Sequence, residues 1–258
     1  MAIGKGRAKA GGKSPGGKKT AAGKAGRGKK SAVKGAAGPK KAPSAPVRRS
    51  YRQYCGLAKA LDALGERWTL LIARDLMLGP RRYGDILKGL EGMTTNLLAA
   101  RLRDMEAGGL IAREKSAGTP RGSAYVLTEA GRELEPVLLA LGKWGWRFME
   151  KPAPEDRRDL AWGLFALKRR YRDVTRPVTA ELRAGGRAWQ YRLAPGYAEL
   201  REGAPWLPDL HLRGEPGAFL ELFYKGKGQR ALAAEGRLAF SGSKEGLKIF
   251  LEAFGLAQ

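Results

Sequence analysis

The first fifty residues of this 258-residue chain contain no acidic and no aromatic residue. They carry 15 Lys and Arg side chains and 11 glycines, and so contribute more than half of the net charge of +24. Such a segment repels itself and has little to bury, so it cannot offset the conformational entropy that folding would cost. We therefore expect residues 1–50 to be a disordered basic tail, with the folded part beginning near Tyr51.

The composition of this tail also suggests a partner. Each Lys or Arg that neutralises a phosphate releases counterions from nucleic acid, so the tail is typical of a non-specific arm for DNA or RNA. A merely solubilising extension is the alternative.

Several protein classes are excluded by simple counts. One Cys and one His cannot form an internal disulfide or a Cys/His metal site. The apolar runs fall far short of the roughly 18 residues that a membrane-spanning helix needs, and no apolar stretch of a secretory signal follows the basic N-terminus. We expect a cytoplasmic protein of the nucleoid, without membrane insertion, metal or cofactor.

From Tyr51 onward, apolar residues recur at helical spacing. The pattern predicts two helices before Gly79-Pro80, a short helix over about 82–90, and a fourth over 94–105 that Gly108-Gly109 ends. Thr94 or Thr95 can cap the fourth helix.

The fourth predicted helix has an apolar face and, opposite it, a narrow polar face. Two alanines there let the backbone approach a groove wall, and Asn and Arg match the edges of adenine and guanine. This composition predicts a recognition helix for double-stranded DNA, whereas a merely solvated helix face is the alternative. The polar face consists of Asn96, Ala99, Ala100 and Arg103.

A basic hairpin is expected next. Strands over 110–115 and 123–127, joined by a loop that contains Arg121, predict the wing of a winged helix. A long helix from Glu129 to Glu150 should follow, with apolar residues on more than one face, so it needs a second packing partner. We interpret that partner as a second copy of the chain in a homodimer, with packing against the rest of the chain as the alternative.

Residues 52–148 resemble the HxlR family of bacterial winged-helix regulators. One departure is that Glu66 and Arg67 separate Gly65 from Trp68, where the family more often has a single basic residue. The residues that carry the resemblance are Cys55, Gly65, Trp68, Thr69, Gly79 to Tyr83, Leu98, Leu102, Tyr125, Leu127, Thr128 and Gly131.

The resemblance implies a transcription regulator that binds a palindromic operator as a dimer. Asn96 and Arg103 would contact base edges, and the phosphate contacts would come from Arg81, Arg82, Thr95, Arg101 and Arg121. As an alternative, Arg101 could pair with Asp104 or Asp62. The full set of expected DNA-contacting residues is Arg81, Arg82, Thr94, Thr95, Asn96, Ala99, Ala100, Arg101, Arg103, Lys115 and Arg121.

Cys55 is a candidate redox sensor. Several members of the HxlR family sense oxidants or electrophiles through a Cys at this place, and a helix N-terminus with basic neighbours would favour its thiolate. A small buried apolar residue is the alternative.

The chain divides into three predicted parts. Residues 1–50 form the tail and 51–150 the winged helix, while Pro152 and Pro154 indicate a linker to a second domain over 155–258. The overall fold class is therefore α+β: a winged helix-turn-helix domain followed by an α+β domain, with a disordered tail.

The second domain should begin with a helix over about 160–171. Apolar and polar residues then alternate in short runs between 178 and 240, which is typical of half-buried strands. One helix around Phe219 and a last one around Phe250 would cover one face of a mainly antiparallel sheet.

No catalytic motif is found in the second domain. His211 alternates with Leu210 and Leu212 and should point outward, Ser241 and Ser243 lack a His motif nearby, and no Gly-rich phosphate loop follows a strand. We expect a binding protein, not an enzyme.

The order of elements after residue 157 resembles the sterol carrier protein family. The resemblance implies an apolar tunnel between sheet and helices that holds a fatty or other hydrophobic ligand. An ordinary closed core is the alternative, because aromatic stripes usually just pack. The candidate ligand-contacting residues are Trp189, Tyr191, Leu210, Leu212, Phe219, Phe223, Leu238, Phe240, Phe250 and Phe254.

Together these features predict a sequence-specific DNA-binding transcription regulator that responds to a hydrophobic ligand or a redox signal. A nucleoid-associated architectural protein dominated by its basic tail is the main alternative. A lipid-transfer module tethered to DNA is a more distant one.

Overall fold

The structure, a computed structural model, describes residues 50–115, 123–205 and 207–256. The described residues all belong to one compact unit. The predicted tail lies almost entirely outside the described residues, as does the wing loop over 116–122, so the predictions for both stay untested.

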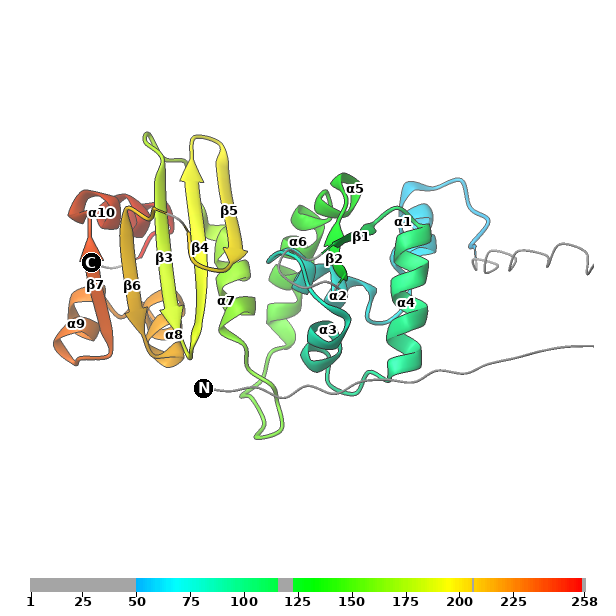
Figure 1. Cartoon of the computed structure of the whole chain (residues 1–258), viewed down its shortest axis with the longest axis horizontal. Helices are drawn as coiled ribbons and strands as arrows, with labels where there is room; N and C mark the ends of the chain where they lie inside the picture. Colours follow the sequence, from blue (N-terminus) through cyan, green and yellow to red (C-terminus); the bar gives the residue numbers. More distant parts are fainter. Residues whose placement is uncertain (1–49, 116–122, 206, 257–258) are drawn as a thin grey trace, which may run out of the picture. The chain divides into compact units, whose positions relative to one another are not determined.

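The described chain begins with four helices and a two-stranded antiparallel hairpin (Figure 1). Ile111 pairs with Leu127 in the hairpin, and the returning strand also bridges back to Arg81. The predicted helices and strands of the winged helix are thus confirmed. They are α1 (Gly56–Leu64), α2 (Thr69–Leu76), α3 (Tyr83–Gly89), α4 (Thr95–Ala107), β1 (Ile111–Lys115) and β2 (Ser123–Leu127).

Local chemistry fixes both ends of α4. The hydroxyl of Thr94 accepts a hydrogen bond from the backbone N–H of Leu97 at 3.3 Å, as an N-cap does. After the helix, Gly109 adopts a φ of 70°, a left-handed conformation that turns the chain into β1. Leu98, Leu102 and Met105 then face the core of this half.

The prediction of one continuous helix from Glu129 to Glu150 is wrong. The structure has α5 (Glu129–Arg132), α6 (Glu135–Gly145) and a 3₁₀ turn, η1 (Trp146–Phe148). Pro136 lies in the first turn of α6. Its missing N–H and its ring are incompatible with a continuous helix through Arg132, so the chain breaks between α5 and α6.

The second half is built on a five-stranded sheet in the order β5-β4-β3-β6-β7. The β3–β6 pair is parallel and the other three neighbouring pairs are antiparallel, so the prediction of a mainly antiparallel sheet is confirmed. The strands are β3 (Val178–Ala184), β4 (Arg187–Ala194), β5 (Tyr197–Glu202), β6 (Leu210–Gly214) and β7 (Leu238–Gly242).

Helices pack on one side of this sheet, and α8 and α10 lie behind it in Figure 1. Trp189, Tyr191 and Leu193 alternate toward them along β4 and are buried. The short helix α9 was not expected from the sequence, because its six residues carry little periodicity. The helical elements are α7 (Leu160–Leu167), η2 (Lys168–Arg170), α8 (Pro216–Tyr224), α9 (Gln229–Ala234) and α10 (Lys244–Ala253).

Within the part of the chain that the structure describes, every helix is too short or too polar to cross a bilayer.

Candidate nucleic-acid interface

Helix α4 presents a polar face away from the core. Leu98 and Leu102 are buried on its inner side, whereas Asn96 and Arg103 are exposed on the outer side. Ala99 and Ala100 are half-buried between them. The predicted polar face therefore exists as a surface, with its side chains in reach of a partner.

The side chain of Arg103 is available for binding. Among the described residues it forms no ion pair, and its neighbours on the outer face are short. A guanidinium that is solvated and unpaired in the free protein can contact a base or a phosphate without first breaking an internal bond.

Two threonines begin α4 and serve the fold as well. The oxygen of Thr94 caps the helix, and the Thr95 carbonyl accepts a hydrogen bond from the hydroxyl of Tyr83 at 2.6 Å. This second bond joins α3 to α4, so it fixes how the two helices of the helix-turn-helix meet. Both threonine side chains remain exposed at the start of α4.

Arg101 has a structural role instead of the predicted phosphate contact. Its guanidinium pairs with Asp104 at 3.1 Å and with Glu66 at 3.2 Å, and only 16% of its side chain is exposed. The alternative pairing with Asp104 is therefore the one observed, because Arg101 lies at the flank of the apolar face and bridges α4 to the residues before α2.

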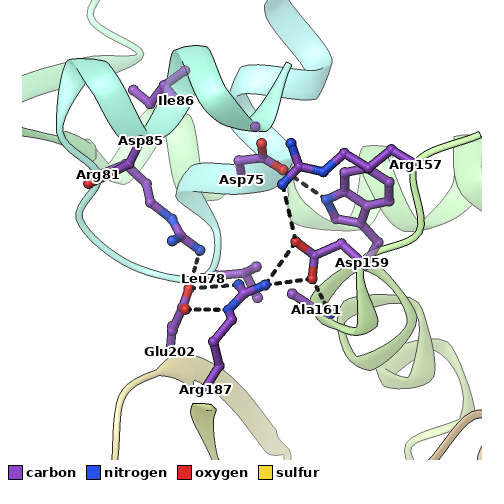
Figure 2. Close-up of a pocket in the computed structure, with 12 residues that line it drawn as sticks. Asp75, Leu78, Arg81, Asp85, Ile86, Arg157, Asp159, Ala161, Arg187 and Glu202 are labelled. Carbon is purple, nitrogen blue, oxygen red and sulfur yellow. Dashed lines mark hydrogen bonds and ion pairs between the residues drawn. The ribbon is translucent and has the colours of Figure 1, made fainter. Parts of the chain in front are cut away.

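Arg81 is also engaged within the protein, contrary to its predicted phosphate contact. Its side chain is 20% exposed and forms an ion pair with Glu202 at the end of β5. Figure 2 shows the Glu202 carboxylate between Arg81 and Arg187. A charge so placed is neutralised inside the protein and is a poor candidate for DNA.

The ion pairs continue from Glu202 to the start of α7. Arg187 donates to both oxygens of Glu202, at 2.8 and 3.1 Å, and to both oxygens of Asp159, at 2.8 and 2.9 Å (Figure 2). Asp159 in turn caps α7 by accepting the N–H of Ala161. The chain of charges surrounds a small cavity of about 130 Å³.

Burial and charge act against each other on these carboxyl groups. Burial alone would raise the pKa of Asp159 and of Glu202, but hydrogen bonds and the positive charge of Arg187 outweigh it, and both pKa values are lowered. The N–H of Ala161 also lowers the pKa of Asp159, as Arg81 lowers that of Glu202. Both groups are therefore charged at neutral pH.

A second contact in the same region joins Asp75 to α7. The indole N–H of Trp162 donates to the carboxylate of Asp75 at 3.2 Å, and the Arg74 guanidinium lies 4.1 Å from the centre of the Trp162 ring. Sequence reasoning missed Asp75, Asp159, Arg187 and Glu202. Charged residues far apart in the sequence carry no periodic signal that could have grouped them.

The other predicted basic contacts are only partly described. Arg82 is exposed at the start of α3. Arg121 and the side chain of Lys115 lie outside the described residues.

Cys55 is exposed at the start of α1, so the alternative of a buried apolar residue is wrong. Hydrogen bonding by the backbone N–H groups of Ala58 and Leu57 lowers the pKa of the thiol. The helix N-terminus that the sequence predicted beside this thiol is therefore present.

The candidate ligand residues of the second half form a packed core. Nine of the ten are at most 2% exposed and belong to one cluster, and Phe240 is half-buried beside it. The Tyr191 ring lies 5.0 Å from that of Phe254 and 5.8 Å from that of Phe250. These contacts favour the closed-core alternative over a tunnel at these residues.

Helix α6 uses two faces, as its composition predicted. Leu139 packs against the core of the second half, and Trp146, just after α6, stacks on Tyr224 with ring centres 6.1 Å apart. The other face is an exposed apolar stripe at helical spacing. We call it the α6 stripe: Val137, Leu141, Trp144 and Phe148, which are 43 to 63% exposed.

Helix α1 leaves much of its apolar face exposed. Leu57 and Leu61 are 70% and 41% exposed, and Leu71 in α2 is 40% exposed. Helical spacing shows that apolar residues share a face, but it does not show whether this chain or another covers that face.

The first half of the chain matches a known protein family and known regulators. The HxlR-like helix-turn-helix family model matches residues 63–153. The HTH-type transcriptional regulator sll1512 of Synechocystis sp. is 38% identical over 101 residues, which cover 39% of this chain and 75% of that protein. The regulator Rv3095 of Mycobacterium tuberculosis is 38% identical over 96 residues, covering 37% of this chain and 60% of that protein.

Among solved structures, the redox regulator HypR in its reduced form shares 30% identity, with a TM-score of 0.34, over 36% of this chain and 92% of HypR. Residues 154–258 lie beyond the family match. The identity to sll1512 over three quarters of its length shows that the chain belongs to the HxlR-like helix-turn-helix family.

Proposed function

We propose that this protein is a sequence-specific, DNA-binding transcription regulator that reads its operator with α4 and acts at the nucleoid. The observation that carries the proposal is the exposed pair Asn96 and Arg103, on a helix whose opposite face is buried. The HTH-type regulators among its relatives support the same function.

The proposed regulator acts as a homodimer through the α6 stripe. Four large apolar side chains on one helix face, each at least 43% exposed, are costly in water and are typical of a protein interface. Two copies would place two α4 helices on the half-sites of a palindrome, about one DNA turn apart.

The proposal is tested by operator selection followed by substitution. Full-length protein would be used to enrich binding sites from random duplex DNA, and affinities would then be measured on the enriched and on scrambled sequences. Asn96→Ala and Arg103→Ala should each cost about 1 to 3 kcal/mol on the enriched site and little on scrambled DNA. Arg230→Ala, which removes an exposed arginine of α9, is the matched control and should change neither.

The same measurement addresses the alternative of an architectural protein. The acid-free composition of residues 1–50 favours that function, because a Lys-rich arm binds any duplex. Failure to enrich a site, or equal losses on both DNAs for the α4 variants, would favour coating of DNA over operator recognition.

Regulation of this binding by oxidants is part of the proposal, supported by the exposed Cys55 thiol with its lowered pKa. Control by a hydrophobic ligand has less support, since its candidate residues pack against one another.

A further inference from the structure

The sheet of the second half has an open face opposite its helices. The strand register aligns residues that point to this face in a row across all five strands. That row is Arg201, Gln190, Glu181, His211 and Ser241. The next row places Arg183 directly beside Arg213, with Ala239 following on β7.

Both oxygens of the Glu181 carboxylate, at the centre of this face, accept hydrogen bonds. Only 4% of the Glu181 side chain is exposed, and its two oxygens accept from Arg183 at 2.8 Å and from His211 Nδ1 at 2.7 Å. The bond from Arg183, followed by that from His211, lowers the pKa of Glu181, so the group is an ionised acceptor. Nδ1 of His211 therefore donates in the shared bond, and its Nε2 can donate to a further acceptor when the ring carries both protons.

Arg213 lacks such a partner. It is exposed, and across the described ranges no acidic residue pairs with it. Its neighbour in the parallel register is Arg183, which is also exposed. Like charges side by side on adjacent strands destabilise a sheet, and Glu181 pairs with Arg183, so Arg213 is the arginine of this pair that has no anion beside it among the described residues.

A hollow adjoins this unpaired guanidinium. It measures about 280 Å³ and is lined by His211, Arg213, Ala239, Phe240 and Ser241. Its wall thus offers a guanidinium, an imidazole and a hydroxyl without a carboxylate. The small side chain of Ala239 leaves room beside Arg213.

We propose that this hollow binds a phosphate group, held by Arg213, His211 and Ser241. Arginine pairs well with phosphate because its fork of N–H groups matches two oxygens, and the hydroxyl can meet a third. The phosphate belongs either to a small phosphorylated molecule or to the backbone of DNA that α4 also contacts.

The direct test is titration of the full-length protein with inorganic phosphate at matched ionic strength, followed by NMR of the Arg side-chain and His211 ring signals. Saturable shifts at Arg213 and His211 are expected, beyond those that potassium chloride produces. Arg213→Gln should weaken phosphate binding about tenfold, as loss of a charge-assisted bond does. Arg176→Gln, at an exposed arginine paired with Glu245 in the same domain, should leave it unchanged.

A second titration, with a 20-base-pair duplex, separates the two sources of phosphate. If Arg213→Gln also weakens duplex binding and lowers the salt slope by about one counterion, the site contacts the DNA backbone. If duplex binding is unchanged while phosphate binding is lost, the site serves a small phosphorylated molecule.

The proposal is overturned if phosphate shifts these signals no more than chloride does, or if Arg213→Gln binds phosphate as the unmodified protein does. Asn96→Ala should impair duplex binding without changing the phosphate titration. Failure of this site is therefore distinguishable from failure of the function proposed for α4.

Discussion

Arg81 and Glu202 form an ion pair that ties the residue two before α3 to the last residue of β5. The backbone of Arg81 is held as well, because it exchanges two hydrogen bonds with Tyr125 of β2, at 2.8 and 3.0 Å. The N–H of Glu202 donates to the Leu78 carbonyl at 2.7 Å, which adds a backbone bond between the same segments. The start of the helix-turn-helix is thus fixed to the five-stranded sheet.

A double-mutant cycle measures this connection. Arg81→Ala and Glu202→Ala should each lower the free energy of unfolding, with a coupling of about 1 kcal/mol between them, since the pair is only partly exposed. Urea denaturation of the two single variants and the double variant gives the value. Strictly additive effects would show that the ion pair contributes nothing.

Arg81→Ala also checks the assignment of roles in the DNA interface. Because its charge is already neutralised by Glu202, its loss should change operator affinity much less than Arg103→Ala does. If Arg81→Ala lowers operator affinity as much as Arg103→Ala does, Arg81 contacts DNA after all.

Local patterns predicted most of the secondary structure. The stripe of Leu98 and Leu102, the cap at Thr94 and the glycine at 109 each act within a few residues, so α4 is legible without knowledge of the fold. Pro136 also indicates the break before α6, but the apolar residues that continue at helical spacing past it favoured a single long helix.

The site was less predictable, because pairing depends on tertiary placement. The sequence placed Arg103 on the outer face of α4 and offered Asp104 as a partner for Arg101, but it could not show that Arg101 is 16% exposed between two carboxylates while Arg103 is exposed and unpaired among the described residues. Glu66, the second partner of Arg101, lies outside α4, and no spacing rule links Arg81 to Glu202 across 120 residues.

The proposed dimer predicts the behaviour of a substitution in the α6 stripe. Leu141→Glu places a charge in the centre of the stripe, so it should convert the dimer into a monomer without unfolding it. Operator affinity should then fall roughly a hundredfold, because the two half-sites are no longer bound together. Light scattering after size exclusion measures the mass.

The matched control for this substitution is Leu207→Glu, which alters a leucine that is 80% exposed outside the stripe. It should remain a dimer with normal affinity. If Leu141→Glu also remains dimeric, the interface lies elsewhere.

Cys55 should be the site of any thiol-dependent response. Its pKa is lowered by the backbone N–H groups of Ala58 and Leu57, so the alkylation rate should rise at a lower pH than it does for a free cysteine. A mild oxidant should weaken operator binding by the unmodified protein and spare Cys55→Ser. Because the chain has one Cys, any disulfide it forms joins two molecules.

If the oxidant weakens operator binding equally in the unmodified protein and in Cys55→Ser, the thiol has no part in the response. Mass spectrometry under non-reducing conditions identifies the product on Cys55.

The ion pairs around Arg187 predict a specific dependence of stability on pH. Asp159 and Glu202 have lowered pKa values in the folded protein, so both bind protons more weakly there than in the unfolded chain. The stability they contribute is therefore present above the ordinary carboxyl range and is lost as the pH falls through their lowered pKa values.

Arg187→Gln removes a positive charge that lowers both pKa values. At pH 7 it should be less stable than the unmodified protein by about 1 to 2 kcal/mol, a figure reduced for solvent screening because Arg187 is 35% exposed. This difference should shrink as the pH falls below the ordinary carboxyl range and through the lowered pKa values, since protonated carboxyl groups no longer distinguish the two proteins. Urea denaturation across this range measures the difference. Arg192→Gln, at an arginine that is 61% exposed beside Glu199, is the control and should have little effect at any pH.

The difference in stability between Arg187→Gln and the unmodified protein could instead stay constant down to pH 3. That result would mean that Arg187 stabilises the fold by packing against Trp189, whose ring centre lies 4.8 Å from its guanidinium, and not by its charge.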